Sequence, residues 1–216
     1  SQIQMHPEIG LTFASALRSI LRHDPDIILV GEIRDNETAD IAIQSALTGH
    51  LVLSTLHTND SVGAVNRLVN MGVEPYLVAA SMVAALAQRL VRRICKHCKV
   101  EDENISRRER AEIADVLGIA AEDVKAWKGA GCLECDQSGY RGRVAIYEIF
   151  LLDEEIQDLV SAEAGTSVLR KTAIEHGMRT LRQDGWEKVS LGQTTIEEVQ
   201  RITSTFQISY DLGETE

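Results

Sequence analysis

Two short apolar segments of this chain each lead into a side chain that can take part in acid–base chemistry. Ile27–Val30 is followed by Gly31 and Glu32, and Leu51–Thr55 is followed by His57. Unbroken apolar runs of this length are typical of strands in a parallel sheet that is covered on both faces. Ligands and chemistry collect at the carboxyl edge of such a sheet. We therefore expect Glu32 and His57 to meet at one edge and to form a single site.

Four cysteines form the second group of residues that can carry chemistry. They occur as two Cys-x-x-Cys pairs, Cys95 with Cys98 and Cys132 with Cys135. Two thiolate pairs of this spacing match the tetrahedral ligand set of a structural zinc site, although the loop between them is longer than in a simple zinc ribbon. His97 could replace one of the cysteines. Redox-active pairs and four free thiols remain as alternatives.

The first half of the chain is expected to alternate between helices and strands. In order, the pattern predicts a helix from Thr12 to about His23, the strand Ile27–Val30, a helix capped by Asp35 that ends near Gly49, the strand Leu51–Thr55, and a helix from Ser61 to Gly72. This alternation favours βαβ units and a parallel sheet, and therefore an α/β fold. After Pro75, the apolar run Leu77–Leu86 predicts a long buried helix that leads into the basic segment Arg89–Lys99.

The second half of the chain is expected to contain an insert and a helical region. A charged, helical insert is predicted over Ser106–Lys128, between the cysteine pairs, and a strand over Val144–Phe150. In the helical remainder, Thr195 and Glu198 form a capping-box pattern, and the residues after Thr203 look like a frayed tail. We therefore expect three regions, 1–92, 93–143 and 144–216, of which the middle one is a small metal-binding subdomain braced by its zinc because it cannot build its own core.

Composition narrows the class of protein. The chain has 216 residues, 44% of them hydrophobic, and a net charge of −11. This charge argues against nucleic acid as a ligand, because such binding depends on neutralising phosphates with cations. The longest apolar run is too short to span a bilayer. Cysteines in metal-type spacing favour a reducing, cytoplasmic compartment.

Several short stretches resemble the secretion ATPases of bacterial type II secretion systems and type IV pilus assembly. The resemblance runs from about Ile3 to about Thr203 and includes the paired cysteines. The other matching stretches are Gly31-Glu32-Ile33-Arg34-Asp35, Thr48-Gly49-His50, Ser54-Thr55-Leu56-His57-Thr58-Asn59, Ala87-Gln88-Arg89-Leu90 and Gly177-Met178-Arg179-Thr180-Leu181. No P-loop sequence, Gly-x-x-x-x-Gly-Lys-Ser/Thr, occurs in the chain. The resemblance therefore implies the C-terminal part of a RecA-like P-loop ATPase core, with a four-cysteine zinc subdomain and a helical C-terminal region.

The resemblance also implies a role for each residue of the first site. Glu32 would activate water for hydrolysis of ATP beside Mg²⁺, and His57 would contact the γ-phosphate. Arg34 and Thr55 would lie next to the nucleotide. From the residues alone, Glu32 could equally be a strand-end glutamate paired with Arg34, and Arg34 could serve either the phosphates or a neighbouring carboxylate. His50 is expected at the other end of its strand, about 15 Å away by strand rise.

The remaining implications concern assembly. The whole protein would be a homo-hexamer at the cytoplasmic face of the inner membrane, held there through an integral platform protein and cytoplasmic-domain proteins of the secretion or pilus machine. The cysteine element favours the assembly or secretion branch of the family over the retraction branch. Cys95, Cys98, Cys132 and Cys135 would hold Zn²⁺.

Two alternatives come from other classes of protein. The chain as given could be a binding and assembly module that is inactive without a P-loop. A zinc-dependent nucleic-acid-binding protein is suggested by the cysteines and by the basic run of Arg89, Arg92, Arg93, Lys96 and Lys99, but the acidic net charge counts against it. A sheet cut through its middle would expose apolar faces, so we also expect the chain alone to self-associate.

Overall fold

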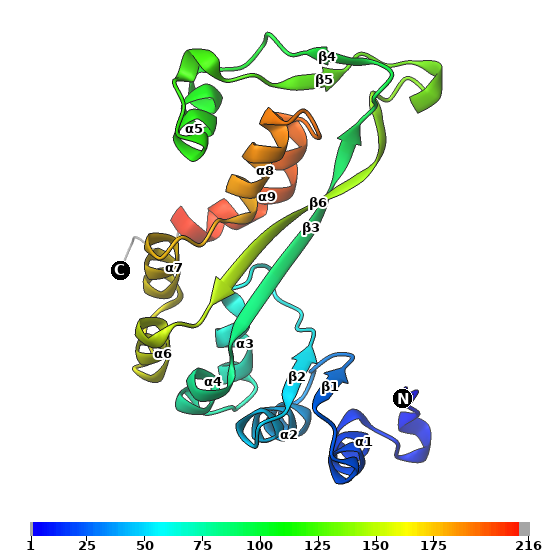
Figure 1. Ribbon diagram of the computed structural model, residues 1–216, viewed down its shortest axis with the longest axis vertical. Helices are drawn as coiled ribbons and strands as arrows, with labels where there is room; N and C mark the ends of the chain where they lie inside the picture. Colours follow the sequence, from blue (N-terminus) through cyan, green and yellow to red (C-terminus); the bar gives the residue numbers. More distant parts are fainter. Residues whose placement is uncertain (1, 212–216) are drawn as a thin grey trace. The chain divides into compact units, whose positions relative to one another are not determined.

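The computed structural model describes the backbone of residues 2–211, with the side chains of residues 2–6 and 8–204 (Figure 1). The chain divides into two compact units. The first unit comprises the residues up to Ala85 together with Phe150–Ala173. The second unit comprises Leu86–Ile149 and the residues from Ile174 onward.

The first unit is built around a βαβ element. Strand β1 (Ile27–Val30) pairs in parallel with β2 (Leu51–Ser54), so that Ile27 lies opposite Leu51 and Val30 opposite Ser54. Helix α2 (Asn36–Leu47) connects the two strands and begins where the Asp35 carboxylate accepts the N–H of Thr38, at 2.8 Å. This is the strand–helix–strand order that the sequence predicts, with the Asp35 cap in the predicted place.

One face of this two-stranded sheet is exposed, which corrects the prediction that both faces are covered. Ile28 and Val30 are buried, but Ile27 and Leu29 are 62% and 73% exposed. Leu51 and Leu53 of β2 are also about half exposed. The continuous apolar run of each strand therefore reflects one covered face and one face that is uncovered in residues 2–211.

Short helices precede and follow this element along the first unit. Ahead of β1 lie η1 (Pro7–Ile9), α1 (Phe13–Ile20) and η2 (Leu21–His23), and α1 begins at a capping box formed by Thr12 and Ser15. After β2 come α3 (Gly63–Asn70) and α4 (Pro75–Ser81), and later α6 (Glu154–Ser161) and α7 (Thr166–Glu175). Asp60, not the predicted Ser61, accepts the N–H of Gly63 at the start of α3, at 2.8 Å. The buried core of this unit includes Leu17, Ala39, Val62, Leu68 and Val78.

The long helix predicted over Leu77–Leu86 is wrong. Helix α4 ends at Ser81, and Ala84–Ile94 forms strand β3, which pairs with β6 (Tyr140–Leu151). The N–H of Leu152 donates to the carbonyl of Val83 and the N–H of Cys95 to that of Gly139, so the pair is antiparallel, as the arrows in Figure 1 also show. The alanines and leucines of this segment favour a helix locally, and the long-range partner strand overrides that preference.

The second unit places the insert against the C-terminal helices. Strand β4 (Lys99–Glu101) pairs antiparallel with β5 (Trp127–Gly129), and α5 (Arg107–Leu117) and η3 (Ala121–Asp123) lie between them in the chain. The predicted insert is therefore helical only in part. One buried cluster joins α5 with α8 (Leu181–Ser190) and α9 (Ile196–Asp211), through Ile113, Ala114, Val124, Ala126, Trp186, Val189 and Val199.

The insert shares this core with the C-terminal helices. The side chains of Ile113 and Trp186, 0% and 1% exposed, pack in the same cluster, so the insert obtains its apolar contacts from the C-terminal helices. Helix α9 continues past Thr203, where a frayed tail was predicted, and residues 212–216 lie outside the described part of the chain. No helix within residues 2–211 has the length and apolar character needed to cross a membrane.

Candidate functional site

Hydrogen bonds beyond the ends of β1 and β2 bring the two predicted acid–base residues together. The N–H of Ile33 donates to the carbonyl of Thr55 at 3.0 Å, and the hydroxyl of Thr55 donates to the carbonyl of Gly31 at 2.8 Å. These bonds continue the contact between the segments past the last paired residues of the strands. Glu32 and His57, which follow the two strands, are thereby held at the same edge. The Thr55 hydroxyl itself is used to join the strands.

Glu32 is the centre of this edge. Its Oε2 atom lies 2.6 Å from Nε of Arg34 and 3.0 Å from Nε2 of His57. The Glu32 side chain is 22% exposed, whereas those of Arg34 and His57 are 67% and 75% exposed. The carboxylate is thus partly sheltered, while its two partners reach it from solvent.

The contacts of Glu32 keep it ionised and leave one oxygen available. The hydrogen bond from Arg34, followed by that from His57, lowers the pKa of the Glu32 carboxyl from its ordinary value. Both contacts fall on Oε2, and among the described residues Oε1 has no hydrogen-bond partner. An ionised carboxylate with one oriented and one open oxygen can accept a proton from a bound water.

The other histidine of the family-like stretches lies elsewhere. His50 precedes β2, and its Nδ1 is 2.9 Å from the carbonyl of Ser45 and 3.2 Å from the hydroxyl of Thr48. Both partners belong to the last turn of α2 and the residue after it. His50 therefore packs on the end of that helix, at the opposite end of β2 from Thr55.

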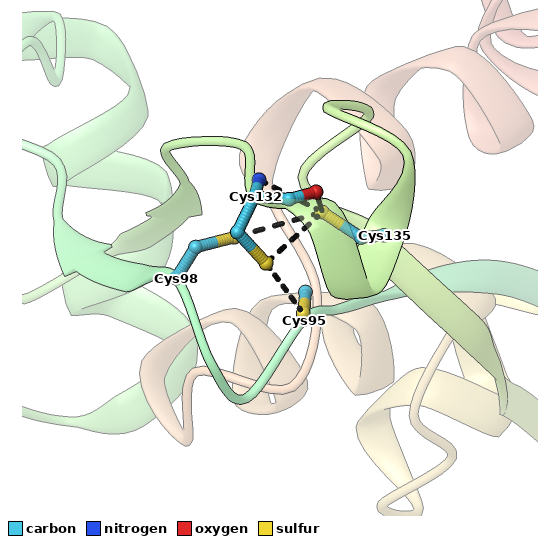
Figure 2. Close-up of side chains that lie close together, drawn as sticks. All are labelled: Cys95, Cys98, Cys132 and Cys135. Carbon is cyan, nitrogen blue, oxygen red and sulfur yellow. Dashed lines mark hydrogen bonds between the residues drawn. The ribbon is translucent and has the colours of Figure 1, made fainter.

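The four cysteines converge on one point in the second unit, as Figure 2 shows. Cys95 follows β3, Cys98 precedes β4, Cys132 immediately precedes η4 (Leu133–Cys135), and Cys135 is the last residue of η4. Sulfur–sulfur distances are 3.9 Å for Cys95 and Cys132, 3.8 Å for Cys98 and Cys135, and 3.7 Å for Cys132 and Cys135. His97 is exposed and is not a member of this cluster.

These distances fit a tetrahedral metal site. Four sulfurs placed about 2.3 Å from a central zinc ion lie about 3.8 Å from one another. A disulfide would need about 2.05 Å between two sulfurs, and all four cysteines are free. The donor set is therefore suited to a thiophilic ion such as Zn²⁺.

The surroundings of the cluster act differently on two of its thiols. Burial raises the pKa of the Cys132 thiol to about 12. Burial also acts on Cys135, but hydrogen bonds from the backbone N–H groups of Cys132 and Gly139, each at 3.3 Å, outweigh it and lower the pKa to about 7. Cys135 is thus the thiolate that the protein backbone already stabilises.

Sequence reasoning missed an ion-pair network in the second unit, centred on the buried carboxylate of Glu198. The side chain of Glu198 is 0% exposed; it accepts hydrogen bonds from the guanidinium of Arg92 at 2.7 Å and from that of Arg201 at 2.9 and 3.0 Å. The Arg92 guanidinium also stacks 4.0 Å above the ring of Tyr140. The capping-box pattern of the sequence paired Glu198 with the nearby Thr195. Thr195 does accept the N–H of Glu198, at 3.3 Å, while the glutamate binds the arginines.

Several cations of the basic run Arg89–Lys99 have partners within the protein. Arg92 pairs with Glu198, and the ammonium group of Lys99 lies 4.5 Å from the centre of the Trp127 ring. Nη1 of Arg89 donates to the carbonyl of Gln88 at 3.0 Å, so three of the five cations have intramolecular partners among the described residues.

The sequence is similar to those of known secretion and pilus proteins. A family model described as "Type II/IV secretion system protein" matches residues 1–201. The type II secretion system protein HxcR of Pseudomonas aeruginosa is 51% identical over 203 residues, covering 94% of this chain and 39% of that protein. The type IV pilus assembly ATPase PilB of Thermus thermophilus is 50% identical, covering 92% of this chain and 22% of that protein. The chain thus spans about two fifths or less of the length of these relatives.

A solved structure shows a similar fold. A crystal structure of the pilus retraction motor PilT with bound ADP superposes with a TM-score of 0.60 at 25% identity, covering 88% of this chain and 43% of that one. The α/β character of the chain is therefore shared with an ATPase fold.

Proposed function

Because the chain belongs to the type II/IV secretion system protein family, we propose that the whole protein is an ATP-hydrolysing motor that drives pseudopilus or pilus assembly. The observation that carries this proposal is the arrangement at the carboxyl edge of β1 and β2. There Glu32 is ionised, and Arg34 and His57 hold one of its oxygens. Hydrolysis of a phosphoanhydride needs a carboxylate that orients or deprotonates the attacking water, together with groups that stabilise charge on the phosphates.

In this proposal each residue at the carboxyl edge of β1 and β2 has its own role in hydrolysis. Oε1 of Glu32 accepts the proton of the attacking water, while Oε2 stays bonded to Arg34 and His57. His57 would contact the γ-phosphate, and Arg34 would neutralise charge next to it. Mg²⁺ bound with the nucleotide would supply further neutralisation of the phosphate charge.

The phosphate cradle is assigned to a part of the protein outside these 216 residues. The sequence contains no P-loop, whose backbone N–H groups and lysine hold the β- and γ-phosphates. Gly31 also stands where many P-loop enzymes have an aspartate that helps to hold Mg²⁺. The exposed face of β1 and β2 fits a RecA-like core in which more of the sheet and its covering helices come from the same missing part.

The four-cysteine cluster is proposed to hold structural zinc. The support is that all four sulfurs lie within 4.8 Å of one another and that three of their separations, 3.7 to 3.9 Å, match the dimensions of a ZnS₄ tetrahedron. The ion would tie the end of β3 to the turn at η4, which precedes β6. The intact protein is further proposed to act as a homo-hexamer at the cytoplasmic face of the inner membrane, attached through a platform protein and cytoplasmic-domain proteins of the machine.

The second candidate is a non-catalytic assembly module, which the missing P-loop favours for the chain as given. ATP turnover of the full-length protein, measured beside that of the 216-residue chain, separates the two. We expect turnover in the full-length protein and none in the chain alone. A full-length protein that binds no nucleotide and has no turnover would refute the motor and support the module. Zinc measured in the same samples should amount to one ion per chain, and a metal-free folded protein would refute the zinc site.

A further inference from the structure

The segment that carries His57 is anchored at both of its ends. We call residues 55–62 the His57 loop. At the first end, Thr55 is bonded to Gly31 and to Ile33, as described above. At the second end, the hydroxyl of Thr58 donates to the carbonyl of Asp60 at 2.9 Å. The position of His57 therefore depends on contacts on either side of it along the chain.

Asp60 is the anchor at the second end, and it has two partners. Its Oδ1 accepts the N–H of Gly63 at 2.8 Å, which fixes the start of α3. Its Oδ2 accepts a hydrogen bond from Nη2 of Arg170 at 2.8 Å. The Arg170 side chain is 9% exposed and that of Asp60 is 20% exposed. Solvent screens such a pair much less than it screens the surface ion pairs of this chain.

Arg170 belongs to α7, which contacts the same region a second time. The side-chain amide of Asn66 on α3 donates to the hydroxyl of Thr166 at the start of α7, at 2.5 Å. Helix α7 therefore holds both the end of the His57 loop and the helix that follows it. The first unit ends within α7, at Ala173, and the chain continues from there into the second unit.

The imidazole of His57 has few contacts of its own. Its side chain is 75% exposed, and its Nε2 atom lies 3.0 Å from Oε2 of Glu32. Packing therefore does little to orient this ring, so the backbone of the loop must place it within hydrogen-bond distance of Glu32. The anchors of the loop are the groups that fix this backbone.

We propose that Arg170 is a positioning residue, which acts through Asp60 to hold the His57 loop so that His57 reaches Glu32. The inference rests on the proposed function, in which His57 and Glu32 belong to the hydrolytic site. It assigns to α7 a part in setting the geometry of that site, although Arg170 and Asp60 are 110 residues apart in the sequence.

The test is a double-mutant cycle on ATP turnover of the full-length protein. Arg170→Gln is measured alone and together with His57→Gln. We expect Arg170→Gln to lower kcat about 10- to 100-fold, the loss typical of a misplaced catalytic group, with the KM for ATP unchanged. In the His57→Gln background, Arg170→Gln should change kcat by less than about twofold. Arg170 acts on kcat through the placement of His57, and the contribution of His57 to kcat is already lost in that background.

Arg182→Gln is the matched control. Arg182 is a half-buried arginine of the second unit that binds Glu112 at 3.0 Å and stacks on Trp186. Its replacement should lower the thermal midpoint without lowering kcat. Arg170→Lys keeps the positive charge without the planar fork, and it should restore part of the lost turnover. This variant replaces Arg170→Gln in the cycle if the glutamine protein does not fold.

The outcomes separate the positioning role from the proposed function. Equal losses in kcat with and without His57→Gln would overturn the positioning role, and so would unchanged turnover in Arg170→Gln. If His57→Gln has no measurable turnover, the positioning role is tested by amide hydrogen exchange of the His57 loop. Faster exchange of residues 55–62 in Arg170→Gln than in Arg182→Gln supports the role, and equal exchange refutes it. A wild-type protein without ATP turnover would refute the motor itself, and with it the role of Arg170.

Discussion

Replacing Glu198 by glutamine removes a buried negative charge that joins two arginines. The carboxylate is 0% exposed and accepts hydrogen bonds from both guanidinium groups and from the backbone N–H of Arg92 at 2.9 Å. Burial alone would raise the pKa of Glu198, but the bonds from Arg201 and Arg92 outweigh it and lower the pKa to about 2. The glutamine would leave Arg92 and Arg201 next to a neutral group.

The size of the effect follows from this pKa. The ordinary value is 4.5 and the folded value is about 2, and one pKa unit corresponds to about 1.4 kcal/mol, so ionised Glu198 contributes about 3 kcal/mol to the free energy of unfolding. Because the folded pKa is the lower one, this stability is fully present above about pH 4.5. It is lost as the pH falls from there through about 2.

Urea unfolding of the second unit, followed by tryptophan fluorescence from pH 7 to pH 2.5, measures this contribution. At pH 7 we expect Glu198→Gln to lower the free energy of unfolding by about 3 kcal/mol, and the gap to wild type should shrink as the pH falls. Glu197→Gln, at the exposed neighbouring position, is the control and should change little. A Glu198→Gln protein as stable as wild type at pH 7, or a gap that stays constant in acid, would refute the reasoning.

Three further predictions concern the metal, the core and the exposed sheet face. Cys135→Ser should remove the zinc and lower the unfolding midpoint of the second unit. X-ray absorption of the zinc in the wild-type protein should give four sulfur ligands at about 2.3 Å. Nitrogen ligands in that spectrum would contradict the four-cysteine site. Trp186→Ala should cost about 3 to 5 kcal/mol in urea unfolding, because this 1% exposed side chain joins α5 to α8 and α9; a loss below about 1 kcal/mol would mean that the cluster repacks. The 216-residue chain should self-associate through the exposed leucines of β1 and β2, and Leu53→Lys should reduce the mass measured by light scattering; a monomeric wild-type chain would exclude this.

Local signals were enough to predict the elements that position the first site. The strand Ile27–Val30 has the predicted bounds, and the Thr12 and Asp35 caps are in place, because these depend on residues only a few positions apart. Strand β3 could not be predicted in this way. Its segment is rich in alanine and leucine, and what makes it a strand is β6, which lies far along the chain.

The same distinction applies to the sites. Glu32 and His57 could be placed at one edge because each follows a short strand, and strands of a parallel sheet end at the same edge. The cysteine cluster was readable from its spacing alone. The Asp60–Arg170 pair and the Arg92–Glu198 pair join residues more than 100 positions apart. No local pattern marks such pairs, and only the tertiary contact reveals them.

The role of Glu32 is tested most directly by ATP turnover of the full-length Glu32→Gln protein, with nucleotide affinity measured in the same preparation. Glutamine preserves the shape of the side chain but cannot accept the proton of the attacking water. We expect kcat to fall by about 100-fold or more while the affinity for ATP is retained, and Glu37→Gln, which alters an exposed carboxylate of α2, to leave both unchanged. Turnover of Glu32→Gln equal to that of wild type would contradict the account.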